Sequence, residues 1–368
     1  METYILVLDS FLSLLLFGPL VAAFWRGTWG LLDIYMLPDN QVLSLCASLV
    51  WGLLVYLAVV ILQSPMMSLN KKMGSPVFYI VSRLHSYILS IAIVNHWRGI
   101  WGLLNMTGAT FLSAGLTLGV STTFLVLCRG MCNTVSAPLL TISDIGREEF
   151  FRITTVFKTQ PRASLRFYMD SCFSVVIIIG FVIAKWRGMW TLIDLLLTPD
   201  DAIRSAWLSV IAGNILAVLL FIIQWPVMYL ANKLRRLKQT TLTFFMLLFI
   251  EDILSFLGFV ASNLVWRGFW NLQDQCLLVH NKELSNWVSH GVAVVILMAV
   301  LHYNMVMQAG LGTDGDIINS EDTTFFETKF ITNFIQHSSR TYDLGADPPT
   351  IDVPQTAVFK IETISLPI

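Results

Sequence analysis

The sequence predicts an all-α fold, a polytopic membrane helical bundle of about eight transmembrane helices built from four parallel two-helix repeats. Three observations lead to this prediction. The 368 residues are 55% hydrophobic and 13% charged, whereas a soluble domain carries about 25% charged residues. Apolar runs recur along the whole chain, and a nine-residue motif occurs four times. A motif that returns at this length indicates internal duplication.

The apolar runs give the predicted helices. A membrane-spanning helix needs about 20 mostly apolar residues. Runs approaching this length lie at about 4–24, 42–62, 77–96, 109–128, 168–185, 203–223, 241–265 and 287–307. The first run follows no positively charged segment, so we expect a membrane helix there rather than a cleaved signal peptide.

The domain organisation follows from these runs. We expect residues 1–128 to hold the first repeat pair and helices 1–4, and residues 168–308 the second pair and helices 5–8. Residues 129–167 form a predicted cytoplasmic linker. Residues 309–368 are rich in acidic residues, Gly, Pro, Ser and Thr, which predicts a disordered cytoplasmic tail.

The repeated motif reads W-R-G-x-W-x-L-x-D, and we call it the WRG frame. It follows every second predicted helix. Asn105 replaces the final Asp in the second copy. The four copies span Trp25–Asp33, Trp97–Asn105, Trp186–Asp194 and Trp266–Asp274. Copies one and three are 161 residues apart, and copies two and four are 169 apart. All four frames are therefore expected on one side of the membrane, at the outer turns of hairpins with the same orientation.

The orientation follows from Lys and Arg. The three loops opposite the frames, at 63–76, 129–167 and 224–240, hold two, six and four basic residues. Loops rich in Lys and Arg stay in the cytoplasm. We therefore expect both termini in the cytoplasm and the frames outside or in a lumen. Asn105-Met106-Thr107 is a glycosylation sequon on that outer side.

Two interpretations of the WRG frame remain open. Tryptophan favours the membrane interface, and an arginine can keep its stem in apolar surroundings with its charge in the headgroups. Each frame would then be an interfacial anchor and a clasp of its hairpin. Alternatively, four arginines around an axis form a positive vestibule for an anion or an acidic partner, unless the acidic residues neutralise them. The candidate residues are Trp25, Arg26, Trp29, Asp33, Trp97, Arg98, Trp101, Asn105, Trp186, Arg187, Trp190, Asp194, Trp266, Arg267, Trp270 and Asp274.

The spacing within a frame specifies contacts. The two tryptophans are four residues apart, so they share a helical face. The final Asp lies seven residues after the arginine and can pair with it or with the arginine of a neighbouring hairpin. Because Asn105 belongs to the second copy, Arg98 is expected to be the least neutralised of the four arginines.

Ionisable residues inside the predicted helices form a second candidate group, because charges within a membrane are costly. With a helical rise of about 1.5 Å per residue, their similar spacing from the WRG frames places them on one level, toward the cytoplasmic end of the helices. Snorkelling to the inner interface, structural ion pairs and a proton or ion path all remain open, and Arg83 is a candidate partner for an acid of a neighbouring hairpin. The residues are Asp9, Arg83, His85, Asp170, Glu251 and Asp252.

The linker offers a further alternative. Phe150, Phe151, Thr154 and Phe157 fall on one helical face, which suits an amphipathic helix on the inner leaflet. An ordinary linker between the two halves is the competing interpretation.

Enzymatic signals do not appear. The sequence contains no P-loop, no H-E-x-x-H pattern and no nucleophile–base arrangement, and its His and Cys residues lack metal-ligand spacing. We expect no enzyme, no cofactor and no metal. The net charge of −1 gives no basis for nucleic-acid binding.

Together, the eight-helix plan and the tripeptides Trp25-Arg26-Gly27, Trp97-Arg98-Gly99, Trp186-Arg187-Gly188 and Trp266-Arg267-Gly268 resemble the fuseless family of invertebrate membrane proteins. The resemblance covers about residues 1–308. It implies a presynaptic multi-pass protein of the plasma membrane that helps to organise calcium channels at active zones. It implies no catalytic residue.

Two functions are therefore compared. The first is a non-enzymatic membrane organiser, with the lipid bilayer as its surroundings and channel subunits or scaffold proteins as candidate partners through its cytoplasmic loops and tail. The alternative is a transporter or channel with a path along the repeat axis, which the ionisable residues motivate. Apolar stretches such as Val175–Ile179 fill the middle of the predicted helices and favour a closed bundle.

Overall fold

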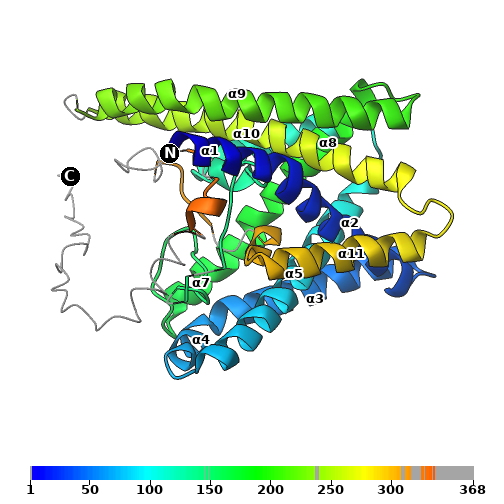
Figure 1. The fold of residues 1–368 in the computed structure, drawn as a ribbon, viewed down its shortest axis with the longest axis horizontal. Helices are drawn as coiled ribbons and strands as arrows, with labels where there is room; N and C mark the ends of the chain where they lie inside the picture. The colour runs from blue at the N-terminus through cyan, green and yellow to red at the C-terminus, as the bar shows by residue number, and fades with distance from the viewer. Residues whose placement is uncertain are drawn as a thin grey trace.

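The described part of the chain is helical in all its regular elements, as predicted (Figure 1). The computed structural model describes residues 2–144, 146–147, 149–236, 240–307, 311–315, 325–326, 328–333 and 335. The α-helices are α1 (Glu2–Leu12), α2 (Gly18–Tyr35), α3 (Gln41–Ile61), α4 (Gln63–Asn70), α5 (Ser75–Asn105), α6 (Phe111–Leu127), α7 (Leu165–Cys172), α8 (Ile179–Leu196), α9 (Ala202–Arg236), α10 (Thr241–Cys276) and α11 (Lys282–Ala299). The shorter elements are the π-helices η1 (Ser13–Phe17) and η3 (Phe173–Ile178) and the 3₁₀-helices η2 (Met131–Thr134) and η4 (Tyr303–Val306).

Among the residues that the structure describes, six helices are long and apolar enough to cross a membrane. Two of them are continuous through a π-helical segment, where η1 joins α1 to α2 and η3 joins α7 to α8. α6 is apolar but has only 17 residues, and α11 has 18, beginning with Lys282 and Glu283. The candidate spans are Tyr4–Tyr35, Gln41–Ile61, Ser75–Asn105, Leu165–Leu196, Ala202–Arg236 and Thr241–Cys276. The membrane character of the chain is thus supported by six helices, and eight crossings stay a prediction.

The WRG frames lie inside helices, not in turns after them. They form the C-terminal parts of α2, α5, α8 and α10. The expectation of frame-bearing loops was wrong because a single glycine between Trp, Arg and Leu does not end a helix that tertiary contacts support. Three of these helices end beyond the frame, where Leu37, Thr198 and Leu278 adopt positive φ angles of 51°, 42° and 47°.

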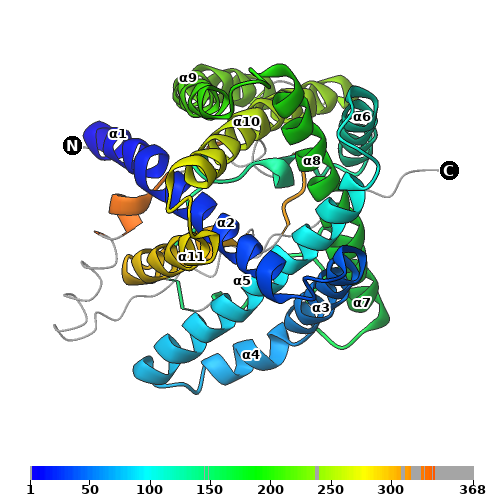
Figure 2. The same cartoon turned by 90° about the vertical axis from the view of Figure 1, so that its right-hand side faces the viewer.

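The helices form a closed ring of pairs. The extensive helix–helix contacts join α3 with α5, α6 with α8, α9 with α10, and α11 with α2. Figure 2 shows α2, α5, α8 and α10 around the centre, with α3, α6, α9 and α11 outside them. The packed pairs therefore differ from the predicted hairpins. α5, α8 and α10 each pack against the outer helix that comes earlier in the chain, namely α3, α6 and α9. In contrast, α2 packs against α11, so that helices from the beginning and the end of the bundle meet.

Two extended segments enter the bundle at the end opposite the frames. One consists of the described residues of the linker between 129 and 164, and the other, the C-terminal segment, consists of the described residues between 300 and 335. The linker contains the helix η2 and turns, and its described residues around Phe151 form no amphipathic helix. Met131 and Tyr303 are buried in the main hydrophobic core, and Phe151 is fully buried as well. Both segments therefore belong to the bundle interior.

The described residues of the predicted tail also pack against the bundle. Leu311, Asp314, Phe325, Phe326 and Thr328 are all buried. These residues are ordered by contacts with the helices, which the acidic composition of the tail did not reveal. Residues 336–368 lie outside the described part of the chain.

Candidate functional site

Eight tryptophans from the four frames meet on the axis of the ring. The inner tetrad consists of Trp25, Trp97, Trp186 and Trp266, and the outer tetrad of Trp29, Trp101, Trp190 and Trp270. Neighbouring rings of the inner tetrad have centroids 5.2–5.9 Å apart and interplanar angles of 66–79°. In the outer tetrad the distances are 5.6–6.1 Å and the angles 83–87°. Such edge-to-face pairs contribute about 0.5–1.5 kcal/mol each beyond their burial.

The tetrads follow from the helical spacing of the frames. Residues four apart lie one turn apart on the same face, so each helix supplies one ring to each tetrad. Trp25, Trp186 and Trp266 are 3–7% exposed, and the rings face the axis rather than lipid. The interfacial-anchor interpretation therefore does not describe the position of these side chains.

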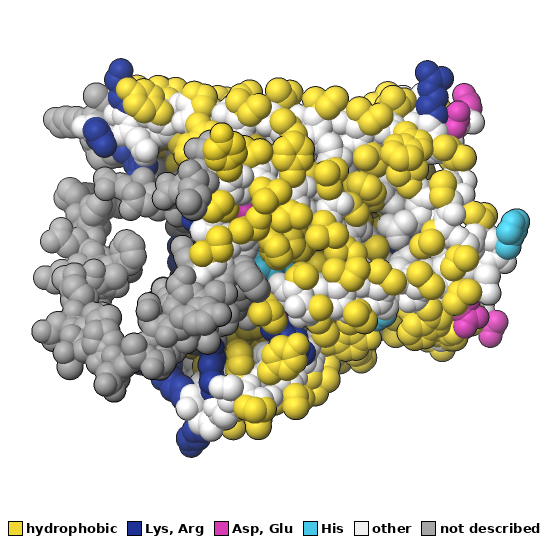
Figure 3. Space-filling model, viewed as in Figure 1, with side chains coloured by type: hydrophobic (Ala, Val, Ile, Leu, Met, Phe, Trp, Pro, Cys, Tyr) yellow, Lys and Arg dark blue, Asp and Glu magenta, His cyan; other side chains and the backbone are white. Residues whose placement is uncertain are grey.

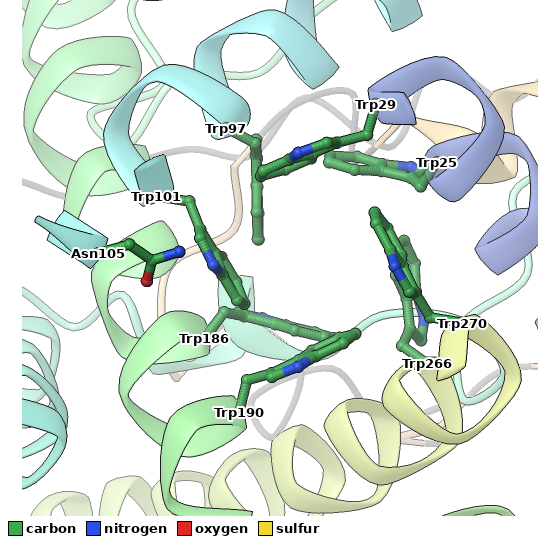
Figure 4. A pocket seen from close by; sticks show the side chains of 9 residues that line it. All are labelled: Trp25, Trp29, Trp97, Trp101, Asn105, Trp186, Trp190, Trp266 and Trp270. Carbon is green, nitrogen blue, oxygen red and sulfur yellow. The ribbon is translucent and has the colours of Figure 1, made fainter. Parts of the chain in front are cut away.

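The tetrads enclose a cavity at the frame end. Its volume is about 200 Å³, and its lining consists of the eight tryptophans and Asn105. Figure 4 shows the indole rings nearly edge-on around a central opening, so that their faces form the walls. Beyond the inner tetrad, a much smaller cavity of about 30 Å³ lies against Ile93, Ser136, Met305 and Val306.

The floor of the cavity is closed by the linker and the C-terminal segment. The indole N–H of Trp25 donates to the carbonyl of Val306 at 2.9 Å. Trp186 and Trp266 donate to the carbonyls of Thr134 at 3.1 Å and Ala137 at 2.8 Å. Hydrogen bonds between these rings and the backbone satisfy groups that are costly to bury unpaired. They also fix the two segments across the axis.

The frame arginines point away from the cavity and connect neighbouring helices. Arg98 donates through Nε to Asp33 of the preceding frame at 2.8 Å. Arg267 binds Asp194 in the same way at 2.7 Å, and Arg26 closes the ring on Asp274 at 2.8 Å. The final Asp of a frame thus pairs with the arginine of a neighbouring helix, which is one of the two pairings that the spacing allowed.

Serines on the outer helices complete the arginine sites. Arg98 donates to Ser48 at 2.6 Å and to Ser44 at 2.8 Å. Serines four residues apart bind the other arginines of the acid pairs: Ser205 and Ser209 bind Arg267, and Ser285 and Ser289 bind Arg26. The sequence analysis missed these serines. The signal was a Ser-x-x-x-Ser or Ser-x-x-x-Thr pattern in each helix that follows a frame.

Asn105 leaves Arg187 as the arginine without a carboxylate in the ring. Arg187 is fully buried, and its Nε lies 3.1 Å from Oδ1 of Asn105. It also donates to Ser113 at 2.8 Å and to the carbonyl of Gly108 at 2.9 Å. The expectation that Arg98 is the least neutralised was wrong, because each arginine uses the acid of the preceding frame. The same contact occupies the side chain of the sequon asparagine.

The frame glycines allow the paired helices to touch through their backbones. A Cβ on Gly268 would lie 2.7 Å from the backbone nitrogen of Val210. A Cβ on Gly27, Gly99 or Gly188 would likewise come within 2.8 Å of backbone atoms on the partner helix. Small residues at such crossings permit close packing in membranes. The glycine of the frame is thus required by the helix pair.

Arg83 binds an acid that the sequence analysis did not single out. It forms an ion pair with Asp144 of the linker, not with an acid of a neighbouring hairpin as expected. Asp144 also accepts the backbone N–H groups of Tyr303 and Asn304, both at 2.9 Å. Burial raises the pKa of Asp144, although Arg83 and these N–H groups act in the opposite direction. Asp144 therefore ties the linker to both α5 and the C-terminal segment.

Three of the predicted acids bind backbone N–H groups of the two segments. Asp9 accepts from Ile331 at 2.6 Å, and Glu251 accepts from Gly315 at 2.6 Å. Asp170 accepts from Phe157 and Thr159, both at 3.2 Å. The structure thus brings these acids to the inner end of the bundle as anchors for the linker and the C-terminal segment.

A buried lysine next to the third frame was also missed. Lys185 is fully buried, with Nζ 3.2 Å from Oγ1 of Thr134 and 4.1 Å from the ring centroid of Phe259. The carboxylates of Asp252 and Asp314 act on it electrostatically. Its signal was its position directly before Trp186, where the other copies have Phe24, His96 and Val265.

His85 makes an aromatic contact, and no metal cluster surrounds it among the described residues. His85 packs edge-on against Phe151, with centroids 4.9 Å apart. Among the residues that the structure describes, no group of three or more His, Cys, Asp or Glu side chains is placed to hold a metal ion.

Comparison with known proteins adds one match. A family model with the description "Fuseless" matches residues 4–307. No curated protein and no solved structure matches the chain. The matched range includes all four frames, the linker and η4.

Proposed function

Because the chain belongs to the Fuseless family, we propose that it is a non-enzymatic multi-pass membrane protein that organises calcium channels at presynaptic active zones. The channel role comes from the family resemblance described above. It agrees with a bundle whose described interior is used for packing and for anchoring its own segments.

One observation carries the choice of an organiser over a transporter. The carbonyls of Thr134, Ala137 and Val306 bind the inner tetrad from below, and the cavity beyond the inner tetrad measures only about 30 Å³. A transport path needs a polar route through the midplane of the membrane. In the described part of the chain, the axis below the tryptophan cavity is instead blocked by the inner tetrad and by backbone.

The proposed topology has eight crossings with both termini in the cytoplasm of a cell whose plasma membrane holds the chain. α6 and α11 extend over about 26 Å at 1.5 Å per residue, close to the hydrocarbon thickness of about 30 Å. Figure 3 shows hydrophobic side chains over the middle of the visible face and charged side chains gathered at its two ends. The basic residues Lys71, Lys72 and Arg147 belong to the end that the positive-inside rule places in the cytoplasm.

Partners would bind the surfaces that the ring leaves free. The outer helices expose Trp51, Trp207 and Trp225, which suits contact with lipid or with channel subunits. The cytoplasmic loops and the tail are the proposed binding segments for scaffold proteins. The charge balance provides no surface for nucleic acid.

Co-expression with a presynaptic voltage-gated calcium channel tests the organiser function. We expect a higher channel density at the cell surface and a larger calcium current than with the channel alone. The variant Arg98→Ala, which opens the ring, should lose this effect, and Arg204→Ala at an exposed position in the first turn of α9 is the matched control. Unchanged channel density and current with normally inserted protein would reject the proposal.

The alternative function is a transporter or channel, and the buried charges around Lys185 are the observation that favours it. Purified protein in liposomes tests it directly. Ion or solute flux that disappears in Glu251→Gln or Asp9→Asn would support the transporter or channel function and reject the organiser proposal. We expect liposomes with and without the protein to show the same flux.

A further inference from the structure

The walls of the cavity between the tetrads are almost entirely aromatic. Eight indole rings line it together with the amide of Asn105, and Figure 4 shows the ring faces turned toward the opening. The face of an aromatic ring carries a negative electrostatic potential, and tryptophan has the strongest such face among the aromatic residues. Rings of both tetrads therefore direct negative potential to one point on the axis.

The positive groups near the site are turned elsewhere. Arg26, Arg98 and Arg267 use their guanidinium groups between the helices, on carboxylates and serines. The buried Arg187 donates to Asn105, Ser113 and the carbonyl of Gly108 and does not line the cavity. The N–H groups of Trp25 and Trp266 are bound to backbone carbonyls below the floor. Neither cationic side chains nor these indole donors are thus available to an anion in the cavity. The anion vestibule that the sequence allowed is replaced by a site of the opposite preference.

A compact organic cation fits this environment. A dry apolar cavity of about 150 Å³ accepts a benzene molecule, so about 200 Å³ accommodates a group of similar or slightly larger size. A quaternary ammonium group has no N–H donors that need partners, and aromatic cages bind it through cation–π contacts. We propose that the tryptophan cavity is a binding site for a quaternary ammonium group.

An adjoining pocket suits the rest of such a ligand. It shares Trp29 and Trp270 with the tryptophan cavity, has a volume of about 580 Å³, and contains Asp33, Asp274 and Lys282. The side chains of Asp33 and Asp274 are 55% and 45% exposed, so their remaining oxygens face solvent at the mouth and favour the approach of a cation. The ammonium group of Lys282 in this pocket can neutralise the negative charge of a phosphate group on the ligand. The same chemistry therefore fits a free quaternary amine and the headgroup of a phosphatidylcholine.

Equilibrium binding of radiolabelled choline to the purified protein tests the site. We use nanodiscs of phosphatidylglycerol, which lack quaternary ammonium groups and leave both ends of the protein accessible. Saturable binding is expected, with competition by tetramethylammonium. The neutral isostere 3,3-dimethylbutan-1-ol should compete at least tenfold less well, because it lacks the charge. Equal competition by this alcohol, or no saturable choline binding, would overturn the proposal.

Single substitutions locate the site. Trp101→Leu removes one wall and should weaken choline binding by about 3- to 30-fold, as expected for the loss of one cation–π contact. Trp101→Phe keeps an aromatic face and should weaken it less. Trp207→Phe, at an exposed position outside the frames, is the matched control and should bind as the unchanged protein does. If all three variants fold with normal melting temperature and bind alike, the cavity is not the site.

Nanodiscs of two lipids separate the two sources of the ligand. If the headgroup of phosphatidylcholine occupies the cavity, choline binding in phosphatidylglycerol discs disappears in phosphatidylcholine discs, and Lys282→Gln restores part of it. If a free amine is the ligand, both discs give the same affinity. Either result supports a quaternary ammonium site, and absence of binding in both kinds of disc rejects it. The organiser function is measured separately as channel density, so one proposal can fail without the other.

Discussion

Nε of the buried Arg187 lies 3.1 Å from the amide oxygen of Asn105, where the three equivalent arginines each meet a carboxylate. α8 is therefore held to α5 by a hydrogen bond from a charged guanidinium to a neutral amide, without the ion pair of the other three contacts. Because an arginine binds a carboxylate more strongly than a neutral amide, this contact is the weakest of the four in the ring.

Replacement of this amide should strengthen the ring. We expect Asn105→Asp to raise the free energy of unfolding by about 1 kcal/mol, since the new carboxylate would be half exposed like its equivalents and partly screened. Asn105→Ala should lower it by about 1–3 kcal/mol, because Arg187 loses a partner while buried. Thermal unfolding of unglycosylated protein in detergent measures both changes. A lower melting temperature for Asn105→Asp would contradict the ring model.

The frame glycines should not tolerate a methyl group. Gly268→Ala would force α10 away from the backbone of α9, where the added Cβ meets Val210 at 2.7 Å. Overpacking of this kind costs about 1–3 kcal/mol. Gly119→Ala on α6 is the matched control, because its Cβ has no neighbour within 4 Å. We expect a lower melting temperature for the first variant and an unchanged or higher one for the second. Equal effects would show that the close approach is unimportant.

The arginine of a frame should contribute more than its acid. Arg267 is 3% exposed and uses Nε, Nη1 and Nη2 on three side chains. Arg267→Lys cannot reproduce this fork of donors and should cost about 2–4 kcal/mol. Asp194→Asn keeps an acceptor at a half-exposed position and should cost about 1 kcal/mol. Chemical denaturation of both variants checks the order, and the reverse order would place the stabilisation in the acid.

Loss of Asp144 should release the linker. Asp144→Ala removes at once the partner of Arg83 and the acceptor of two backbone N–H groups. We expect faster cleavage at Arg162 and Arg166 when trypsin is added on the side of the membrane that the linker faces. The exposed ion pair of Glu149 with Arg152 provides the control, because Glu149→Gln should leave the cleavage rate unchanged. A cleavage rate in Asp144→Ala equal to that of the control would show that other contacts hold the linker.

The frame contacts were partly predictable from sequence. The spacing of Trp25 and Trp29 places both rings on one face, and the interval from Arg26 to Asp33 allows a pair of the observed kind. The direction of pairing was not predictable, because it depends on which helix follows which around the ring. The wrong expectation for Arg98 has this origin, because the spacing allowed Asn105 to pair with the arginine of its own frame or with the arginine of a neighbouring helix.

The segments inside the bundle were less predictable. Asp144 and Asp314 lie in stretches without hydrophobic periodicity, and their partners are backbone N–H groups of distant residues such as Tyr303 and Met131. Backbone partners leave no residue-specific signal. A weak signal existed in the paired phenylalanines Phe150-Phe151 and Phe325-Phe326, one pair after each half of the chain, of which Phe151, Phe325 and Phe326 are buried.

The contact between α2 and α11 makes the order of biosynthesis matter. Arg26 is inserted near the beginning of translation, whereas Asp274 follows 248 residues later and Ser285 and Ser289 follow 259 and 263 residues later. Until these residues emerge from the ribosome, a charged side chain remains without its partners in the bilayer, which is unfavourable. A nascent chain that stops before α11 therefore holds Arg26 without its serine partners. Membrane quality control can recognise this exposed charge until α11 is synthesised and packs against α2.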